Sequence, residues 1–568
     1  MVQRVKRSNN KKRKINMLVG DARHALVAGR HDVCEHVCRS IDAIEKNNPD
    51  VANFRGVMCS LAGRHQQAET LFVQAINGMP KKLEFRNNLG QLYLGQHLYK
   101  DAADVYGGAL ALESASLSAQ TGFGLALIKL GYVEQAIQTL RKAKEQHPQD
   151  VNVLMGLAGA CCEQKHFQEA RSLLTEVIER SPNNVGGHFQ LGLIAMLHGE
   201  TEEAELHIRK TLSIAPAHIE AWMALANLKR FQTDTDPDLA SIQSIYQNSA
   251  RHSTGRMKLA FVMGRIMDTL KHYDQAFEYI QEANDYRVKH SHYNQDAELG
   301  HLQAIMQSYT SESFAHTSGI QDETPVFIVG MPRCGSMLVE QILVSHPAVG
   351  SRGQWGFFES VLADYSEEKG TITLEQSTNF SPNQWQELGR SYLEQLKSED
   401  SNARRIIDKT LVNLRLLGSI HCALPKARII HVRRHPLDNC WSIYKSNLPG
   451  YLSDYGCNPG QLGYYYRMYE RLMQHWRDVL PEGVMYELDY EDLVNDQEYE
   501  TRRLLDACGL PWDEQCLRFY ETDSAIHTAS SMQACRPISA ASIGTWKPYE
   551  KHLQPLVKIL GVGERAIP

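Results

Sequence analysis

The pattern of apolar and polar positions changes near Pro325 and divides the chain into two halves. Before Pro325 the sequence resembles itself at a fixed interval. From Pro325 onward, short apolar and β-branched runs alternate with stretches of helical pattern. A chain of 568 residues is too long for one ordinary hydrophobic core, so we expect at least two domains.

The first half repeats with a period of 34 residues, as in "GRHQQAETLFVQAI" from Gly63 and "GETEEAELHIRKTL" from Gly199. One alanine position marks every period, at Ala68, Ala102, Ala136, Ala170 and Ala204. The positions five residues earlier are Gly63, His97, Gly131, Lys165 and Gly199. Prolines share this phase at Pro80, Pro148, Pro182 and Pro216. Three landmarks in one phase indicate a true structural repeat.

This pattern resembles the tetratricopeptide repeat, a helix–turn–helix unit. Glycine suits the left-handed end of the first helix, and alanine lets the two helices approach closely. One period earlier stand Gly29 and Cys34, and a further unit with Ala276 follows the turn-rich segment "FQTDTDPDL". We therefore expect an all-α solenoid over residues 15–315. Its concave face is expected to bind a protein or peptide, the alternative being a spacer or a dimerisation element.

The second half, residues 325–562, has the pattern of an α/β domain. Its predicted strands are "PVFIVG", "RRIID", "ARIIHV" and "VMYEL", which lie at 325–330, 404–408, 427–432 and 484–488. Alternation with helices predicts a parallel sheet wrapped by helices. Ligands of such sheets bind beyond the carboxyl ends of the strands. The loops after Gly330, Asp408 and Val432 should therefore meet at one site.

Two of these loops carry candidate chemistry. The loop Met331–Met337 can direct main-chain N–H groups at an anion, but Ser336 stands where a nucleotide triphosphatase has its lysine. An ATP-dependent kinase is therefore disfavoured, and no metal is expected. In the loop after Val432, Arg434 and Ser442 are eight residues apart and can face one phosphate. The alternative is that the paired arginines are ordinary surface charges.

Composition sets the remaining expectations. The chain is 43% hydrophobic and 22% charged with a formal charge of −6, which is typical of a soluble globular protein and gives no reason to expect nucleic acid. Residues 1–14 are densely basic and read as a disordered tail. No apolar run reaches the length of about 18 residues that a membrane span needs. The 12 cysteines include no C-x-x-C pair, so we expect buried thiols and a cytoplasmic location.

The second half resembles sulfotransferases that use 3′-phosphoadenosine-5′-phosphosulfate (PAPS). The resemblance is to the bacterial group in which tetratricopeptide repeats precede a domain similar to protein-tyrosine sulfotransferase. The matching motifs are "PRCGSM", "HPAVGSRGQW", "DKTL", "RHPLD" and "TASSMQACRPISAASIGTWKPYEKHL". The resemblance covers essentially the whole chain and implies a P-loop-type fold, PAPS as co-substrate and a hydroxyl acceptor, with a protein tyrosine as one candidate.

The resemblance also implies roles for individual residues. The 5′-phosphosulfate loop would comprise Arg333, Cys334, Gly335, Ser336 and Met337. Arg434 and Ser442 would hold the 3′-phosphate, and Tyr490 would contact the cofactor. A loop from Ser530 to Ser539, which includes Arg536, would close over it. Lys409 and Ser530 would stabilise charge in the transition state.

Several positions depart from the family pattern. Gln354 stands where the family has the glutamate that accepts the proton of the acceptor, and an amide cannot act as a base near neutral pH. Glu359, one turn later, is a candidate replacement, although a solvated helix carboxylate is the simpler interpretation. Met337 and Thr545 also replace polar or basic residues. The alternative function is therefore a repeat scaffold with a catalytically degenerate domain. The oligomeric state stays open, with a homodimer as one alternative.

Overall fold

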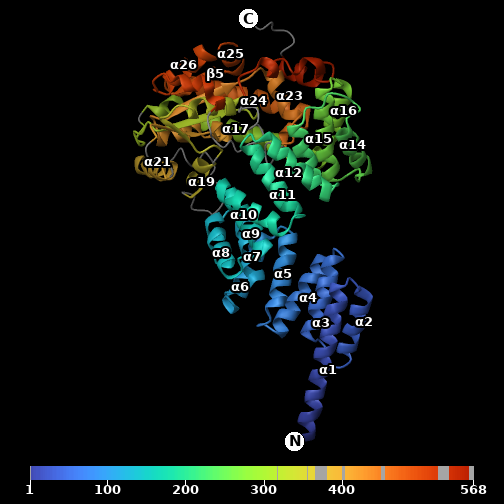
Figure 1. The fold of residues 1–568 in the computed structure, drawn as a ribbon. Helices are drawn as coiled ribbons and strands as arrows, with labels where there is room; N and C mark the ends of the chain where they lie inside the picture. The colour runs from blue at the N-terminus through green and yellow to red at the C-terminus, as the bar shows by residue number, and fades with distance from the viewer. Residues whose placement is uncertain are drawn as a thin grey trace. The chain divides into compact units, whose positions relative to one another are not determined.

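The computed structural model describes residues 2–315, 317–354, 356–364, 380–398, 403–448, 454–521 and 536–561. The chain divides into two compact units, Met1–Ile194 and Ala195–Pro568. Figure 1 follows the chain through helices alone into a region that contains a sheet.

The first unit consists of helices that pair with their neighbours in sequence. Contacts are extensive within the pairs α1 with α2, α3 with α4, α5 with α6, and α9 with α10. The helices are α1 (Val2–Val27), α2 (His31–Asp42), α3 (Pro49–Leu61), α4 (His65–Gly78), α5 (Leu83–Gly95), α6 (Tyr99–Leu112), α7 (Leu117–Lys129), α8 (Val133–Gln146), α9 (Val151–Glu163), α10 (Phe167–Arg180) and α11 (Val185–Leu197), the last of which crosses the boundary.

The repeat landmarks have the conformations that the sequence predicts. The turn between paired helices has a left-handed backbone at every predicted position, including the non-glycine residues His97 (φ 61°) and Lys165 (φ 64°). A left-handed non-glycine residue costs about 1–2 kcal/mol, so the turn geometry outweighs that local preference. The alanine of each period is fully buried. The tetratricopeptide-type solenoid is therefore confirmed.

The same helical pattern continues into the second unit. Lys271 takes the left-handed turn position (φ 65°) and Ala276 is fully buried, as the sixth alanine of the series. The helices are α12 (Thr201–Ile214), α13 (Ile219–Leu228), α14 (Pro237–Asn248), α15 (Thr254–Thr269), α16 (Tyr273–His290) and α17 (Gln295–Ser308), followed by the 3₁₀ turn η1 (Ser311–Phe314).

Within the described residues of the second unit, five strands form one parallel sheet in the order β2-β3-β1-β4-β5. The strands are β1 (Pro325–Gly330), β2 (Val349–Ser351), β3 (Arg405–Asp408), β4 (Arg428–Arg433) and β5 (Met485–Asp489). Because β1 lies between β3 and β4, the strand order reverses direction there. This is the switch point at which ligands of open α/β sheets bind.

Both faces of the sheet are covered. On one face, Val326 and Ile328 of β1 join Val339 and Ile342 of the following helix in a core cluster. Phe327 points to the opposite face, as strand alternation requires, where its ring lies 5.6 Å from that of Tyr392. The helices described in this domain are α18 (Ser336–Val344), α19 (Phe357–Asp364), α21 (Pro382–Leu396), α22 (Leu417–Ala423), α23 (Pro436–Tyr444), α24 (Pro459–Val479), α25 (Tyr490–Asn495), α26 (Gln497–Ala507) and α28 (Gln554–Leu560).

Short 3₁₀ segments complete the second unit. They are η2 (Leu411–Arg415), η4 (Tyr455–Cys457), η5 (Glu514–Glu521), η6 (Ala540–Ser542) and η7 (Lys547–Tyr549).

Two features of the fold differ from the sequence predictions. Residues 2–14, expected as a disordered tail, form the first half of α1. Lysine and arginine are good helix formers, and the helix continues into a segment where Ile15, Ala22 and Ala25 are buried. Strand β2, "VGS", was not predicted because three residues with a central glycine show no apolar run.

Candidate functional site

The loop after β1 is shaped by three residues with positive φ. They are Gly330 (φ 152°), Arg333 (φ 66°) and Gly335 (φ 105°), and Gly335 directly precedes α18. A Cβ at Gly335 would lie 2.4 Å from the Tyr490 ring, so the loop requires glycine there. The first N–H groups of a helix have no acceptor within it and carry a partial positive charge. The loop and the start of α18 therefore favour an anion.

Arg333 lies in this loop, and Ser442 of α23 and Arg434, directly after β4, contact it. Arg333 Nε donates to Ser442 Oγ at 3.2 Å, and Arg434 Nη1 donates to the carbonyl oxygen of Arg333 at 2.9 Å. The Arg434 guanidinium also lies 5.1 Å from the centre of the Tyr490 ring. These contacts offset the strain of the left-handed Arg333, a kind of strain that clusters at functional sites.

The two arginines make the site electropositive. Burial lowers the pKa of Arg333, and the nearby charge of Arg434 lowers it further. Among the described residues, no acceptor pairs with the buried Arg434 Nε. Two neighbouring guanidinium groups suit a phosphate, which offers several acceptor oxygens. The arginine pair is therefore part of a built site and not a solvated surface patch.

Asp438 joins α23 to the C-terminal segment. This fully buried carboxylate accepts hydrogen bonds from Gly544 N (2.7 Å), Thr545 Oγ1 (2.9 Å) and Trp546 N (3.2 Å). The segment is thereby placed so that the carbonyl of Ser542 accepts from Arg434 Nη2 at 2.6 Å. Thr545, a departure from the family pattern, thus has a structural partner.

Lys409 follows β3 and has a partner that the sequence analysis missed. Its ammonium lies 2.6 Å from Glu340 Oε2, and both side chains are nearly fully buried, at 4% and 8% exposed. Ser351 Oγ donates to the other oxygen of Glu340 at 2.6 Å. Glu340 is four residues after Ser336 on α18, so both face the same side of that helix. The pair therefore holds Lys409 one helical turn below the anion loop.

Gln354 and Glu359 are both exposed. The residue before Gln354 is tied to the site, because the Lys409 N–H donates to the carbonyl of Gly353 at 2.9 Å. Glu359 lies in the first turn of α19. The structure thus places the main chain of the residue before Gln354 beside Lys409, whose ammonium pairs with the carboxylate of Glu340.

Three more of the predicted cofactor residues lie at the end of the loop and the start of α18. Ser336 is buried at the first position of α18. Cys334 turns away from the loop surface: its thiol is fully buried, burial raises its pKa to about 11, and its N–H donates to Met331 O at 3.2 Å. Met337 is the second residue of α18.

The predicted closing loop is only partly described. Arg536 and Ser539 are exposed, and Ser539 Oγ accepts from Ala541 N at 3.2 Å at the start of η6. Ser530 lies outside the described residues.

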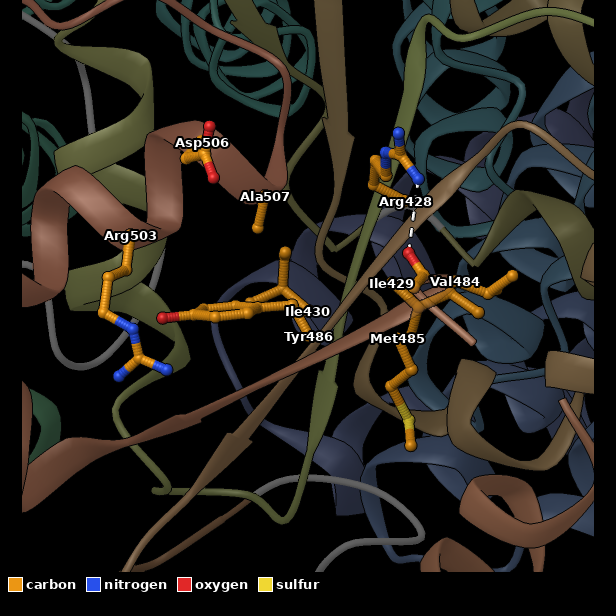
Figure 2. Close-up of a pocket in the computed structure, with 10 residues that line it drawn as sticks. Arg428, Ile429, Ile430, Val484, Met485, Tyr486, Arg503, Asp506 and Ala507 are labelled. Carbon is orange, nitrogen blue, oxygen red and sulfur yellow. Dashed lines mark hydrogen bonds between the residues drawn. The ribbon is translucent and has the colours of Figure 1, made fainter. Parts of the chain in front are cut away.

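A separate pocket lies elsewhere on the sheet. Figure 2 shows it between the starts of β4 and β5 and helix α26, lined by Arg428, Tyr486 and Arg503. Arg428 Nη1 donates to the carbonyl of Gly483 at 3.3 Å. Because parallel strands share an orientation, this pocket is at the amino ends of the strands, opposite the anion loop. It is therefore distinct from the candidate site.

Among the residues that the structure describes, no three His, Cys, Asp or Glu side chains gather as a metal would require. None of the helices described combines the length and apolar character needed to traverse a bilayer.

Comparison with known proteins gives two kinds of match within this chain. Residues 325–514 match the model of the Sulfotransferase family. Residues 162–228 match the tetratricopeptide repeat, and residues 95–177 match subunit 3 of the anaphase-promoting complex, or cyclosome. The repeat matches and the sheet domain correspond to the two halves that the apolar pattern separates.

Relatives in other organisms cover different shares of the chain. An uncharacterized protein of Aquifex aeolicus is 28% identical over 452 residues, which is 77% of this chain and 58% of that protein. Human protein O-mannosyl-transferase TMTC3 is 24% identical over 42% of this chain and 27% of its own length. The chain thus spans less than two thirds of these relatives.

Among solved structures, PilF of Pseudomonas aeruginosa is similar over 38% of this chain and 99% of its own. The TM-score is 0.35 and the sequence identity is 14%.

Proposed function

Because residues 325–514 form a sulfotransferase-family domain that follows a tetratricopeptide-type repeat array, we propose that this protein transfers a sulfuryl group from PAPS to a hydroxyl acceptor.

The observation that carries the proposal is the convergence of Arg333, Arg434 and Ser442 beside a lysine-free anion loop. PAPS has two anionic groups on one adenosine, and the site offers two sets of donors. The loop and the start of α18 suit the 5′-phosphosulfate, and the arginine pair with Ser442 suits the 3′-phosphate. Tyr490, stacked against Gly335 and Arg434, would contact the nucleotide.

The chemical step needs no metal in this proposal. The acceptor oxygen forms a bond to sulfur while the bond between sulfur and the 5′-phosphate oxygen breaks. The products are a sulfate ester, adenosine 3′,5′-bisphosphate and the proton of the hydroxyl. Negative charge grows on the peripheral and leaving oxygens, and prearranged donors stabilise it. Lys409, Ser530 and the loop N–H groups would supply these donors.

The weakest point of the active site is proton removal. Gln354 occupies the position of the usual base, and general base catalysis contributes about 10²- to 10⁴-fold in rate. An exposed amide at this position favours the second candidate function, a repeat scaffold whose domain binds the donor without turnover. Lys409, Arg434 and Ser442 favour the enzyme.

The repeats would serve recognition. Tetratricopeptide arrays offer a concave surface to proteins and peptides, so we propose a protein or peptide as partner, with a tyrosine hydroxyl as one acceptor. We also propose a cytoplasmic location, with a homodimer as the candidate oligomeric state.

Transfer of labelled sulfate from PAPS to a peptide library tests the function directly. An active enzyme labels hydroxyl-bearing peptides, and Lys409→Ala abolishes the label while binding of adenosine 3′,5′-bisphosphate persists. Binding without label in the unmodified protein identifies the scaffold instead. The absence of both binding and label excludes both candidates.

A further inference from the structure

Helix α16, the second helix of the last repeat, packs directly against α23, the helix that carries Ser442. Both belong to the second unit, and Figure 1 shows them side by side. Phe277 of α16 has its ring 6.2 Å from Trp441 and 6.1 Å from Tyr444, with nearly parallel planes. Trp441 and Tyr444 are buried. The repeat array thus supplies part of the core beneath the candidate site.

The repeat helix also caps the carboxyl end of α23. The last carbonyl groups of a helix have no partner within it. Here Asn284 Nδ2 donates to the carbonyl of Tyr444 at 2.8 Å, and Asn284 is fully buried. Arg287 Nη1 donates to the carbonyl of Ser446 at 3.3 Å. Asn284 of the repeat array, 160 positions before Tyr444 in the sequence, therefore fixes the carboxyl end of α23.

Asp268, at the end of α15, completes this support. One oxygen accepts from Tyr549 Oη at 2.5 Å, and the other lies 3.3 Å from Lys445 Nζ. Tyr549 is fully buried and directly follows the segment that Asp438 holds. A single repeat carboxylate therefore connects the end of α23 with the C-terminal segment, and both elements contact Arg434 or Ser442.

We infer that the last repeat, α15 and α16, is a positioning element of the 3′-phosphate site. Asn284 and Asp268 act through α23: they hold the helix at its carboxyl end so that Ser442 meets Arg333 at the other side. Asn284 and Asp268 are positioning residues, and neither side chain contacts PAPS in this inference. This inference rests on the proposed function, because it assigns the 3′-phosphate to Ser442 and Arg434.

The contacts of α16 differ in how deeply they are buried, and an exposed contact provides a control. Asp274 of α16 pairs with Lys551 and with His552, each at 2.7 Å, but its own side chain is 61% exposed and it has no contact with α23 among those of the described residues. Exposed pairs contribute little to stability. Asn284, by contrast, is fully buried, and its loss leaves a carbonyl without a partner. Asp274→Asn is therefore the matched control on the same helix.

The test compares two ligands that differ only at the 3′ position. Affinities of the full-length protein for adenosine 3′,5′-bisphosphate and adenosine 5′-phosphate are measured by competition with labelled bisphosphate. Asn284→Ala should weaken the bisphosphate about 3- to 30-fold and leave the monophosphate within twofold. Asp268→Asn should act in the same direction, and Asp274→Asn should leave both affinities unchanged.

The outcomes separate the inference from its premise. If the unmodified protein does not prefer the bisphosphate, the proposed 3′-phosphate site is wrong and the inference fails with it. If it does and both variants keep that preference, the inference alone is wrong. Equal weakening of both ligands also overturns it, because that result indicates general loss of structure. Should Asn284→Ala not fold, Asp268→Asn gives the same comparison.

Discussion

The buried pair of Glu340 and Lys409 allows a quantitative test of the site. We consider Lys409→Met, Glu340→Gln and the double variant. At 2.6 Å and an effective dielectric constant of about 20, the attraction is about 6 kcal/mol. Desolvation of two ions costs several kcal/mol each, so the net contribution of the pair is small. Removing one partner, however, leaves the other buried and unpaired, which costs about 3–5 kcal/mol.

The double variant should therefore cost less than the sum of the two single variants. We expect a coupling free energy of about 2–3 kcal/mol, near the upper end for residues in contact. Ser351 donates to Glu340 in every variant that keeps the carboxylate. The loss of stability in Lys409→Met should therefore lie near the lower end of the range of about 3–5 kcal/mol. This prediction concerns the free energy of unfolding and does not depend on whether PAPS is the sulfuryl donor.

Tryptophan fluorescence during urea unfolding is the appropriate assay. All seven tryptophans lie in Ala195–Pro568 and none in the first unit, so the signal reports the second unit alone. Urea is uncharged and does not screen the pair. The exposed pair of Arg502 and Glu498, 2.7 Å apart on α26, provides the control: Glu498→Gln should cost less than about 0.5 kcal/mol. If each single variant costs less than about 1 kcal/mol and their effects are additive, Glu340 and Lys409 are not coupled as a buried ion pair.

Three further predictions concern the base, the helix start and acid stability. Gln354→Glu should raise the rate of sulfate transfer by about 10²- to 10⁴-fold, measured with labelled donor; an unchanged rate contradicts the view that the amide limits turnover. Asp438→Asn removes a charged acceptor of three hydrogen bonds and should cost about 1–3 kcal/mol in the tryptophan-detected transition, whereas a change within error would show that the C-terminal segment is held otherwise. Burial alone would raise the pKa of Glu487, but hydrogen bonds from His431 and Arg477 lower it to about 2. The contribution of this carboxylate to the free energy of unfolding is complete above its unfolded pKa of about 4 and is lost as the pH falls toward 2. Between these pH values, the urea midpoint of Glu487→Gln should therefore depend less on pH than that of the unmodified protein. Parallel curves of midpoint against pH for the two proteins argue against this.

The repeat half of the fold could be predicted closely because its signals are local. Turn positions such as His97 and Lys165 were identified by phase alone, and the structure gives them left-handed backbones. The four long strands were likewise visible as apolar runs. The place of the site, at the carboxyl ends of the strands, could be predicted from the alternation of strands and helices. The pairing of Arg333 with Ser442 could not, because it spans 109 positions and no local pattern encodes it.

Other features could not be predicted for physical reasons. In the sequence, Glu340 resembles an ordinary helix carboxylate, because its partner Lys409 lies in the loop after a different strand, β3. The contribution of α16 to the site was missed because the sequence separates repeats from the sheet domain, whereas Asn284 and Phe277 pack across that boundary within one unit. Basic residues near the N-terminus suggested disorder, although lysine and arginine also suit a helix.

We propose that the loop after β1, with Arg333 and Arg434, holds PAPS without a cation. Calorimetric titration of the full-length protein in a metal chelator measures this binding, and a parallel titration uses magnesium and ATP as the competing ligand. We expect saturable binding of PAPS in chelator, at least about 10-fold weaker in Arg434→Ala because a charge-assisted contact is lost. If magnesium-ATP saturates the protein and PAPS gives no response, the loop is not a PAPS site.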